Sequence, residues 1–278
     1  MQFSKINPAI CILLFLPLVS ICQQDTTRKD ELNASVNYQT ALHYFGRTDS
    51  LKSSGEFASI GFKLRSGLYA QGNFIFVQNT ATTTNYAGTT IEAGYHFPQT
   101  KHFSGNVFYT AILYNNKSDL VQSALKSQTG INLAYTNPII TLSGGMDLKF
   151  SDKTDMGATF ELDHIFIYKP GDGKLAFAFD PSAYVYAGTQ NFSTTYIQKQ
   201  NLLGIPISQQ QVTTNATTFS ILAYEFSAPL VFVAGKFNVS VTPSYVVPQN
   251  LISVAGHPEL SEHGQPMFYA VLSMGLKL

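Results

Sequence analysis

Apolar and polar residues alternate along most of the chain from about residue 31 onward. The clearest case is residues 87–97, where Ala87, Thr89, Ile91, Ala93, Tyr95 and Phe97 alternate with glycine, threonine, Glu92 and His96. A period of two places successive side chains on opposite faces of a β-strand. The pattern therefore predicts a strand with one apolar and one polar face.

About twelve such segments of roughly 9 to 15 residues follow one another, the length that a tilted strand needs to cross a bilayer. Residues 218–226 are apolar on both parities, so their facing stays open. In the ninth segment the register is expected to be lost near Asp180-Pro181, and a bulge or an end of pairing is expected at Pro243. The expected outward residues are, in chain order, Leu32, Ala34, Val36, Tyr38; Ala58, Ile60, Phe62, Leu64; Leu68, Ala70, Phe74, Phe76; the 87–97 set; Phe103, Val107, Tyr109, Ala111, Leu113; Thr129, Ile131, Leu133, Tyr135; Ile140, Leu142, Met146, Leu148; Met156, Ala158, Phe160, Leu162; Leu175, Phe177, Phe179; Val231, Val233, Phe237, Val239, Val241; and alternate residues from Phe268 to Leu278.

Short and long connections alternate between these segments. Only residues 151–154 are short where a long connection is expected. Such asymmetry is typical of an up-and-down barrel with short periplasmic turns and long outer loops, whereas a soluble β-sandwich would not need an apolar face on nearly every strand. We predict an all-β, closed antiparallel transmembrane barrel of about 12 strands, with 10 to 14 possible. The short connections are 65–67, 98–102, 137–138, 169–174 and 228–229, and the long ones are 43–55, 78–86, 115–126, 189–215 and 248–265.

The first 22 residues have the pattern of a cleaved signal peptide. Lys5 precedes an apolar run from Ala9 to Ile21, which is shorter than the roughly 20 residues of a membrane-spanning helix. We expect residues 1–22 to be removed, residues 23–30 to form a short periplasmic segment and residues 31–278 to form the barrel. Both cysteines, Cys11 and Cys22, lie in the signal, which excludes thiol catalysis and cysteine metal sites in the mature chain.

The charge content excludes a further class of partner. Charged residues make up 12% of the chain, with 17 basic and 17 acidic residues. This is well below the roughly 25% of soluble domains, and the balance gives no general attraction for nucleic acid.

The last segment has apolar residues at alternate positions back from the C-terminus: Leu278, Leu276, Met274, Leu272, Ala270 and Phe268. With this strand, the mature chain resembles the small, porin-like outer-membrane β-barrels of Gram-negative bacteria, of a Bacteroidetes type. The resemblance implies an outer-membrane location, a lipid bilayer around the barrel, and assembly machinery that recognises the last strand. The chain departs from that family by ending on leucine and by lacking tryptophan, so the interfacial girdle would consist of Tyr38, Phe97, Phe103, Tyr109, Tyr135 and Tyr184.

Inward-facing charges are the first candidates for function. Five acids and four bases lie on the polar parity, with Glu225 assigned there provisionally. They either give a narrow water path a weak preference for cations, or pair across the lumen and hold the barrel shut. These residues are Lys63, Glu92, Asp147, Lys149, Glu161, Asp163, Glu225, Lys236 and Lys277.

The longest loop is a candidate constriction. Its apolar residues Leu202, Leu203, Ile205 and Ile207 stand within a polar run and could fold into the barrel mouth, pack over the rim, or bind a partner. Deleting residues 198–210 should raise single-channel conductance if the loop folds inward.

Metal and enzyme sites find little support in the sequence. His257, Glu259, Glu262 and His263 are suitable zinc ligands, but their spacing matches no known motif, so we predict no metal and no cofactor. A membrane-embedded lipid hydrolase needs a serine activated by histidine. His96, His102 and His164 lie near predicted strand ends, without the His-x-Ser signature of barrel lipases.

The sequence therefore predicts a narrow passive channel or transporter for small polar solutes or ions. The alternative is a barrel with a closed lumen that has a structural role or binds a surface or secretion partner. A lipid hydrolase is the third hypothesis.

Overall fold

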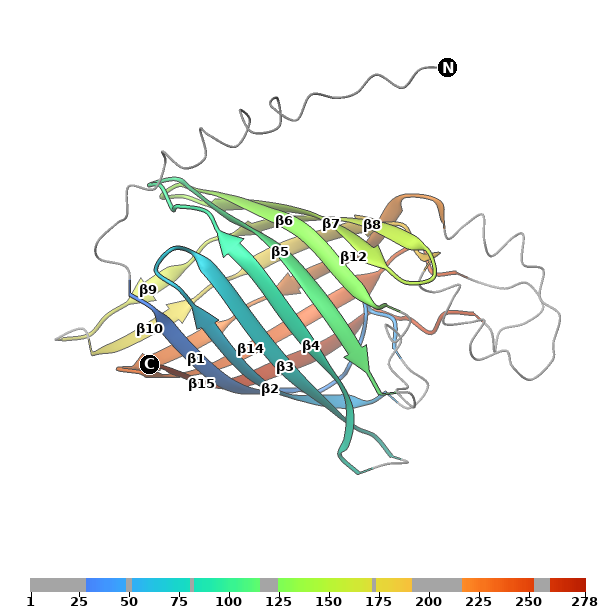
Figure 1. Cartoon of the computed structure of the whole chain (residues 1–278), viewed down its shortest axis with the longest axis horizontal. Helices are drawn as coiled ribbons and strands as arrows, with labels where there is room; N and C mark the ends of the chain where they lie inside the picture. The colour runs from blue at the N-terminus through green and yellow to red at the C-terminus, as the bar shows by residue number, and fades with distance from the viewer. Residues whose placement is uncertain are drawn as a thin grey trace, which may run out of the picture.

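A computed structural model describes residues 29–48, 52–80, 83–115, 125–171, 174–191, 217–252 and 261–278. The expected signal peptide lies outside these residues. Within them, no helix is long and apolar enough to cross a membrane. Fifteen strands form one antiparallel sheet (Figure 1). They are β1 (Glu31–Gln39), β2 (Ser54–Lys63), β3 (Leu68–Gln78), β4 (Asn85–His96), β5 (Phe103–Tyr114), β6 (Ser127–Thr136), β7 (Thr141–Phe150), β8 (Thr154–Asp163), β9 (Phe166–Tyr168), β10 (Leu175–Phe179), β11 (Ser182–Gly188), β12 (Ser220–Ser227), β13 (Leu230–Ala234), β14 (Phe237–Pro248) and β15 (Met267–Lys277).

The sheet closes into a barrel of 12 wall strands, as the alternating pattern predicted. β9 continues β8, β11 continues β10, and β13 continues β12, each after a short interruption. β1 pairs with both β2 and β15, and β14 pairs with β15 on one side and with β12 and β13 on the other. Every described strand except β9 is paired on both sides, and β9 pairs with β10 alone. Pairing on both sides satisfies the backbone polar groups, as a wall surrounded by lipid requires.

The outward face of the wall is apolar. Val36 is 58% exposed, Phe103 61%, Met146 64% and Phe268 77%. These residues belong to the outward sets expected from the alternation. In a globular protein their exposure would be costly, but it suits a wall that faces hydrocarbon.

The two ends of the barrel differ. The start of β1 and the C-terminus lie at one end, where the backbones of Leu32 and Leu278 exchange two hydrogen bonds, and we call this the short-turn end (Figure 1). The strand ends that the long connections join lie at the other end, which we call the long-loop end. One predicted turn is wrong: residues 228–229 interrupt the strand formed by β12 and β13, and the chain reverses at Gly235-Lys236 instead. Gly235 has a φ of +59° there, which glycine adopts without strain.

Three prolines lie side by side across neighbouring strands. Pro181 separates β10 from β11, Pro229 separates β12 from β13, and Pro243 lies opposite the second break, accepting a hydrogen bond from the Ala228 N–H. In an antiparallel ladder the N and O of one residue face the same neighbour. Pro243 has no N–H to donate, and the acceptor that it would need lies on the side of the break between β12 and β13, where pairing is already interrupted. On its other side, Pro243 pairs with Ala270 of β15 in regular register.

The strands at Pro243 and Pro181 are more regular than the sequence predicts. No bulge occurs at Pro243. Alternation also persists through Asp180-Pro181, because Phe179 faces outward before the break and Tyr184 still faces inward after it.

Two β-bulges explain other departures from the pattern. One in β4 turns Ala87 inward, 6% exposed, so its expected outward facing is wrong, and the neighbouring Tyr86 faces out instead. The other, at Leu222 in β12, buries both Leu222 and Ala223, which explains why that segment is apolar on both parities. A bulge adds one residue to one strand and switches the facing of the residues beyond it.

Two further facing assignments are also wrong. In β13 the outward residues are Leu230 and Phe232, which pair with Val241 and Val239, so Val231 and Val233 face inward. The hairpin at Gly235-Lys236 sets this register. Tyr184 belongs to the lumen and not to the girdle.

Candidate functional site

A row of acidic and tyrosine side chains crosses one inner wall of the barrel. Tyr184 of β11 lies directly between Glu161 of β8 and Glu225 of β12 in the strand register. Glu161 accepts hydrogen bonds from Tyr184 and Ser143. Glu225 accepts one from the hydroxyl of Tyr269 on β15, at 2.5 Å. We call Glu161, Tyr184, Glu225 and Tyr269 the acid–tyrosine row.

A third carboxylate is held in the same way on another part of the wall. Glu92 of β4 accepts hydrogen bonds from the Tyr69 hydroxyl and from Thr110 Oγ1, both at 2.8 Å. The chain of bonds extends through Asn106 to Asn132 on β6. Hydroxyl donors satisfy these carboxylates without adding positive charge, so the wall keeps its negative potential.

Other inward charges are paired. Lys149 and Asp147 of β7 form a mostly buried ion pair. At the short-turn end, Lys277 lies 2.8 Å from Glu31. These pairs correspond to the interpretation in which lumen charges stabilise the barrel.

The remaining predicted charges lie at the short-turn end. Lys63 is the last residue of β2 and borders the inner chamber described below. Asp163 is hydrogen-bonded to Thr141 at the end of β8. Lys236 is exposed in the turn between β13 and β14, so it does not line the wall as expected.

The loop between β1 and β2 folds into the barrel. Residues 41–48, here called the inserted loop, contain a tight reversal in which the Tyr44 and Arg47 backbones exchange two hydrogen bonds. Phe45 and Gly46 at its tip have φ of +54° and +75°. Two successive positive φ values characterise a type I′ hairpin turn, for which glycine is favoured at the second position.

Arg47 fixes this loop to the long-loop end. Its side chain is 1% exposed and donates five hydrogen bonds. Nε contacts Glu262 Oε2 at 3.0 Å, and that carboxylate oxygen also accepts the Ile252 N–H at 2.8 Å. The other acceptors are Gln190 Oε1 and the backbone oxygens of Phe45, Leu222 and Gln249.

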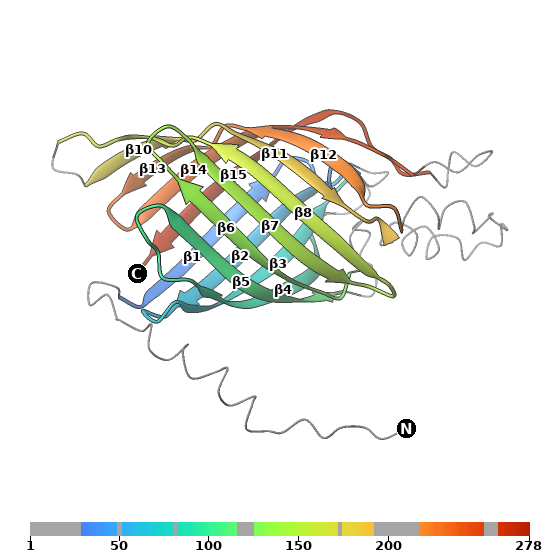
Figure 2. The same ribbon diagram turned by 90° about the horizontal axis from the view of Figure 1, so that it is seen from above.

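The tip of the inserted loop reaches the far wall. The Phe45 ring lies 5.1 Å from the Tyr186 ring on β11 and 5.9 Å from Lys149 Nζ on β7. β7 lies opposite β1 in the strand order, and Figure 2 shows β6, β7 and β8 crossing in front of β1, β2 and β3. The loop therefore spans the lumen.

His43 joins the inserted loop to the acid–tyrosine row. Its ring packs edge-on against the Tyr269 ring at 4.3 Å, and its Nδ1 accepts the Gly46 N–H at 3.2 Å. Loss of hydration lowers the pKa of His43 to about 4. Burial likewise raises the pKa of the Tyr44 hydroxyl well above its ordinary value. Both side chains are therefore neutral at pH 7.

An inner chamber of about 720 Å³ occupies the lumen at the short-turn end. Its walls carry small and polar side chains from β4 to β8, together with the charged residues Lys29, Glu31, Lys63 and Arg65 near the starts of β1 and β3. Glu161 lies at its border, which places the acid–tyrosine row beside it. Lining residues include Lys63, His96, Asn106, Asn132, Ser143 and Thr159.

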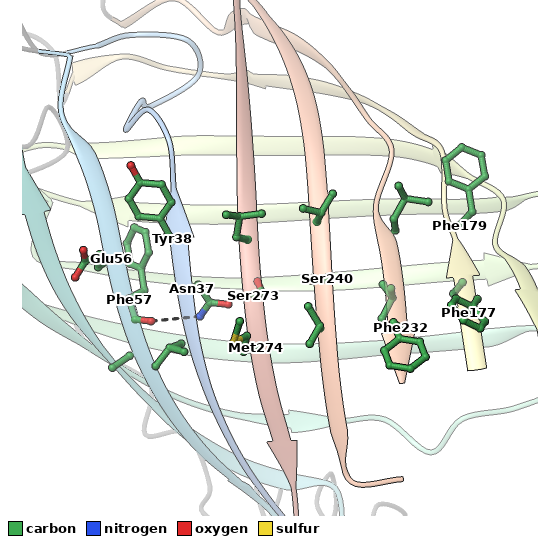
Figure 3. Close-up of a pocket in the computed structure, with 18 of the residues that line it drawn as sticks. Asn37, Tyr38, Glu56, Phe57, Phe177, Phe179, Phe232, Ser240, Ser273 and Met274 are labelled. Atoms are coloured by element: carbon green, nitrogen blue, oxygen red, sulfur yellow. Dashed lines mark hydrogen bonds between the residues drawn. The ribbon is translucent and has the colours of Figure 1, made fainter. Parts of the chain in front are cut away.

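A second cavity is a groove of about 1060 Å³ in the outer wall (Figure 3). Outward residues of β1, β2, β3, β9, β10, β13, β14 and β15 line it, and they are almost all apolar. Glu56 is the exception, an exposed carboxylate on the outward parity of β2. The groove therefore suits acyl chains and not a polar solute.

Several predicted residues lie outside the described part of the chain: Leu202, Leu203, Ile205, Ile207, His257 and Glu259. Of the weak metal candidates, Glu262 contacts Arg47, and the His263 carbonyl accepts the Thr48 N–H. Among the described residues no group of three potential metal ligands occurs. Of the strand-end histidines, His102 and His164 pack against the rings of Tyr135 and Phe166.

The inserted loop and its arginine were not predicted from the sequence. The signal in the sequence that could have indicated them is the pair Phe45-Gly46 followed directly by the basic residue Arg47. The partners of Arg47 outside the loop are 143 to 215 residues away in sequence, so no local pattern could identify them.

One solved structure supports the fold, and two further structures resemble the chain more weakly. An outer-membrane channel from Pseudomonas putida F1 matches with a TM-score of 0.50 and 12% identity, over 92% of this chain and 98% of that one. A KdgM porin matches with a TM-score of 0.49 and 8% identity over 88% and 98%, and LpxR from Salmonella typhimurium with 0.48 and 8% over 88% and 99%. No protein-family profile and no curated protein matches the chain.

At these identities the likeness shows the architecture alone. The chain is an all-β, closed antiparallel barrel of 12 strands, of the type found among outer-membrane proteins. The comparisons give no support to the narrower Bacteroidetes type.

Proposed function

We propose that this barrel lies in the outer membrane and is a narrow, passive, cation-preferring channel for small polar solutes or ions. The observation that carries the proposal is the set of three inward carboxylates, Glu92, Glu161 and Glu225, each hydrogen-bonded to a tyrosine. A confined acidic lining attracts cations and repels anions. No cofactor is required.

Support for the lipid environment comes from the outer surface. The outward parity is apolar on nearly every strand, and the last strand has the alternation that the assembly machinery of the resembling family recognises. We expect export by a signal peptide ending at Cys22.

The second candidate is a barrel with a closed lumen that binds a partner through its loops. The packing at the long-loop end favours it, since Arg47, Leu222, Gln190 and Ile252 are each at most 2% exposed there. Both candidates share the same fold, so only a transport measurement separates them.

The test is planar-bilayer recording with protein purified from outer membranes. A channel gives discrete conductance steps in proportion to the protein added. Heat-modifiable migration on gels verifies that the barrel is folded in each preparation. Steady silence from folded barrel, with the Arg47→Gln variant silent as well, would contradict the channel and favour the partner-binding barrel.

A further inference from the structure

We propose that the inserted loop, residues 41–48, is the size-selecting constriction of the lumen, and that Arg47 is the residue that positions it. This inference rests on the proposed channel function. It assigns the limit on solute size to a loop between the first two strands, at the opposite end of the lumen from the inner chamber.

The inserted loop spans the lumen. Phe45 contacts Tyr186 on β11 and lies near Lys149 on β7, although the loop starts from β1. A segment that touches the opposite wall divides the lumen cross-section. Any solute that enters from the long-loop end must pass the loop.

The two ends of the lumen differ in how densely they are packed. At the short-turn end the lumen holds a chamber of about 720 Å³. At the long-loop end, inward side chains such as Ser244, Val246 and Ile252 are almost fully buried. Since the lumen is wide at one end and packed at the other, the narrowest section coincides with the inserted loop.

Hydrogen bonds hold the inserted loop in place. Arg47 joins the loop to residues of three other segments, Gln190, Leu222 and Glu262, through its guanidinium. The Thr48 N–H adds a backbone bond of 2.9 Å to the His263 carbonyl. A guanidinium offers five donors in a fixed plane, so one side chain can fix the loop against several partners at once.

The loop also contributes to which solutes pass. His43 and Phe45 present their rings to Tyr269 and Tyr186, so the section is lined by neutral aromatic side chains next to the carboxylates of the acid–tyrosine row. A solute there must be small, hydrated, and neutral or cationic. Bulky and anionic solutes are excluded.

The experiment compares the wild type with Arg47→Gln in planar bilayers and in liposomes loaded with neutral sugars of increasing size. Releasing the loop should raise single-channel conductance at least twofold and admit larger sugars. The matched control is Lys126→Gln, which removes an exposed ion pair with Asp152 at the same end of the barrel. That variant should keep wild-type conductance and the wild-type size limit.

A rescue separates loop position from damage to the barrel. Thr48 and His263 are neighbours next to the bridge between Arg47 and Gly264, at a separation that a disulfide can span. Because no other cysteine remains once the signal is removed, Thr48→Cys with His263→Cys can be added to Arg47→Gln. Oxidation should restore the wild-type size limit, and reduction should abolish the restoration.

The outcomes are distinguishable. Equal conductance and size limit in wild type and Arg47→Gln would overturn the constriction while leaving the channel intact. An enlarged limit that oxidation does not reverse would also overturn it. A silent wild type with a conducting Arg47→Gln would support the constriction, and silence in both would overturn both proposals.

Discussion

The ring of Phe45 lies 5.9 Å from Lys149 Nζ, although Phe45 follows β1 and Lys149 belongs to β7 on the opposite wall. Lys149 is also paired with Asp147, so its ammonium is held in place beneath the ring. A cation close to an aromatic face is attracted to it, by roughly 0.5 to 2 kcal/mol depending on exposure. This contact is one of those that keep the loop tip across the lumen.

Phe45→Ala should widen the lumen without releasing the loop. The anchor at Arg47 remains, so we expect an increase in single-channel conductance that is smaller than that of Arg47→Gln. Phe103→Ala is the control, because Phe103 is 61% exposed on the outward face. Equal conductance of Phe45→Ala and wild type would show that the ring does not narrow the path.

Acidification should loosen the inserted loop through His43. The pKa of His43 is about 4 when the loop is docked, against 6.5 when it is exposed, so the docked form binds the proton less well. The free energy of loop docking is therefore unchanged above pH 6.5. As the pH falls from 6.5 toward 4, protonation of His43 weakens docking by about 3 kcal/mol in total. Conductance should therefore rise between pH 7.5 and pH 5.

The variant His43→Gln has no imidazole to titrate and is compared with the wild type. The conductance of the variant should change less between pH 7.5 and pH 5. If the variant and the wild type respond identically to acid, another group causes the response and the role of His43 is refuted.

Tyr269→Phe should destabilise the barrel. The change removes the 2.5 Å hydrogen bond to Glu225, leaving a half-buried carboxylate without that donor, and bonds to charged groups contribute about 1.5 to 3 kcal/mol. We expect a comparable loss in the free energy of unfolding, measured by urea titration in vesicles. In the Glu225→Gln background, Tyr269→Phe should lower the free energy of unfolding by less.

Tyr245→Phe is the matched control for that measurement. Tyr245 lies on the neighbouring strand β14 and packs against Phe268 on the outer face. Its hydroxyl does not face the acid–tyrosine row. Equal destabilisation by Tyr245→Phe and Tyr269→Phe would refute the proposed contribution of the Tyr269–Glu225 bond.

The wall of the barrel could be predicted because it follows a local rule. Alternation places Val36, Ile60 and Met274 outward, and this period-two pattern depends only on neighbours in sequence. The errors occur where one extra residue shifts the parity, at Ala87, or where the reversal falls elsewhere, at Gly235. Neither a bulge nor a turn has a unique local signature.

The candidate site was only partly predictable. Glu92 and Glu161 were identified as inward from their parity, but their tyrosine partners lie on other strands and depend on the register between strands. The inserted loop depends on contacts between Arg47 and residues more than a hundred positions away. Tyr184 was misassigned because the break at Asp180-Pro181 looked like a loss of register.

The most direct test of the central claim is the reversal potential in a salt gradient across a planar bilayer. We predict a potential of the sign for cation preference, which moves toward zero when Glu92, Glu161 and Glu225 are all replaced by glutamine. Glu56→Gln, which removes a carboxylate from the outer face, should leave it unchanged. An anion-selective wild type, or a triple variant with unchanged selectivity, would contradict the account.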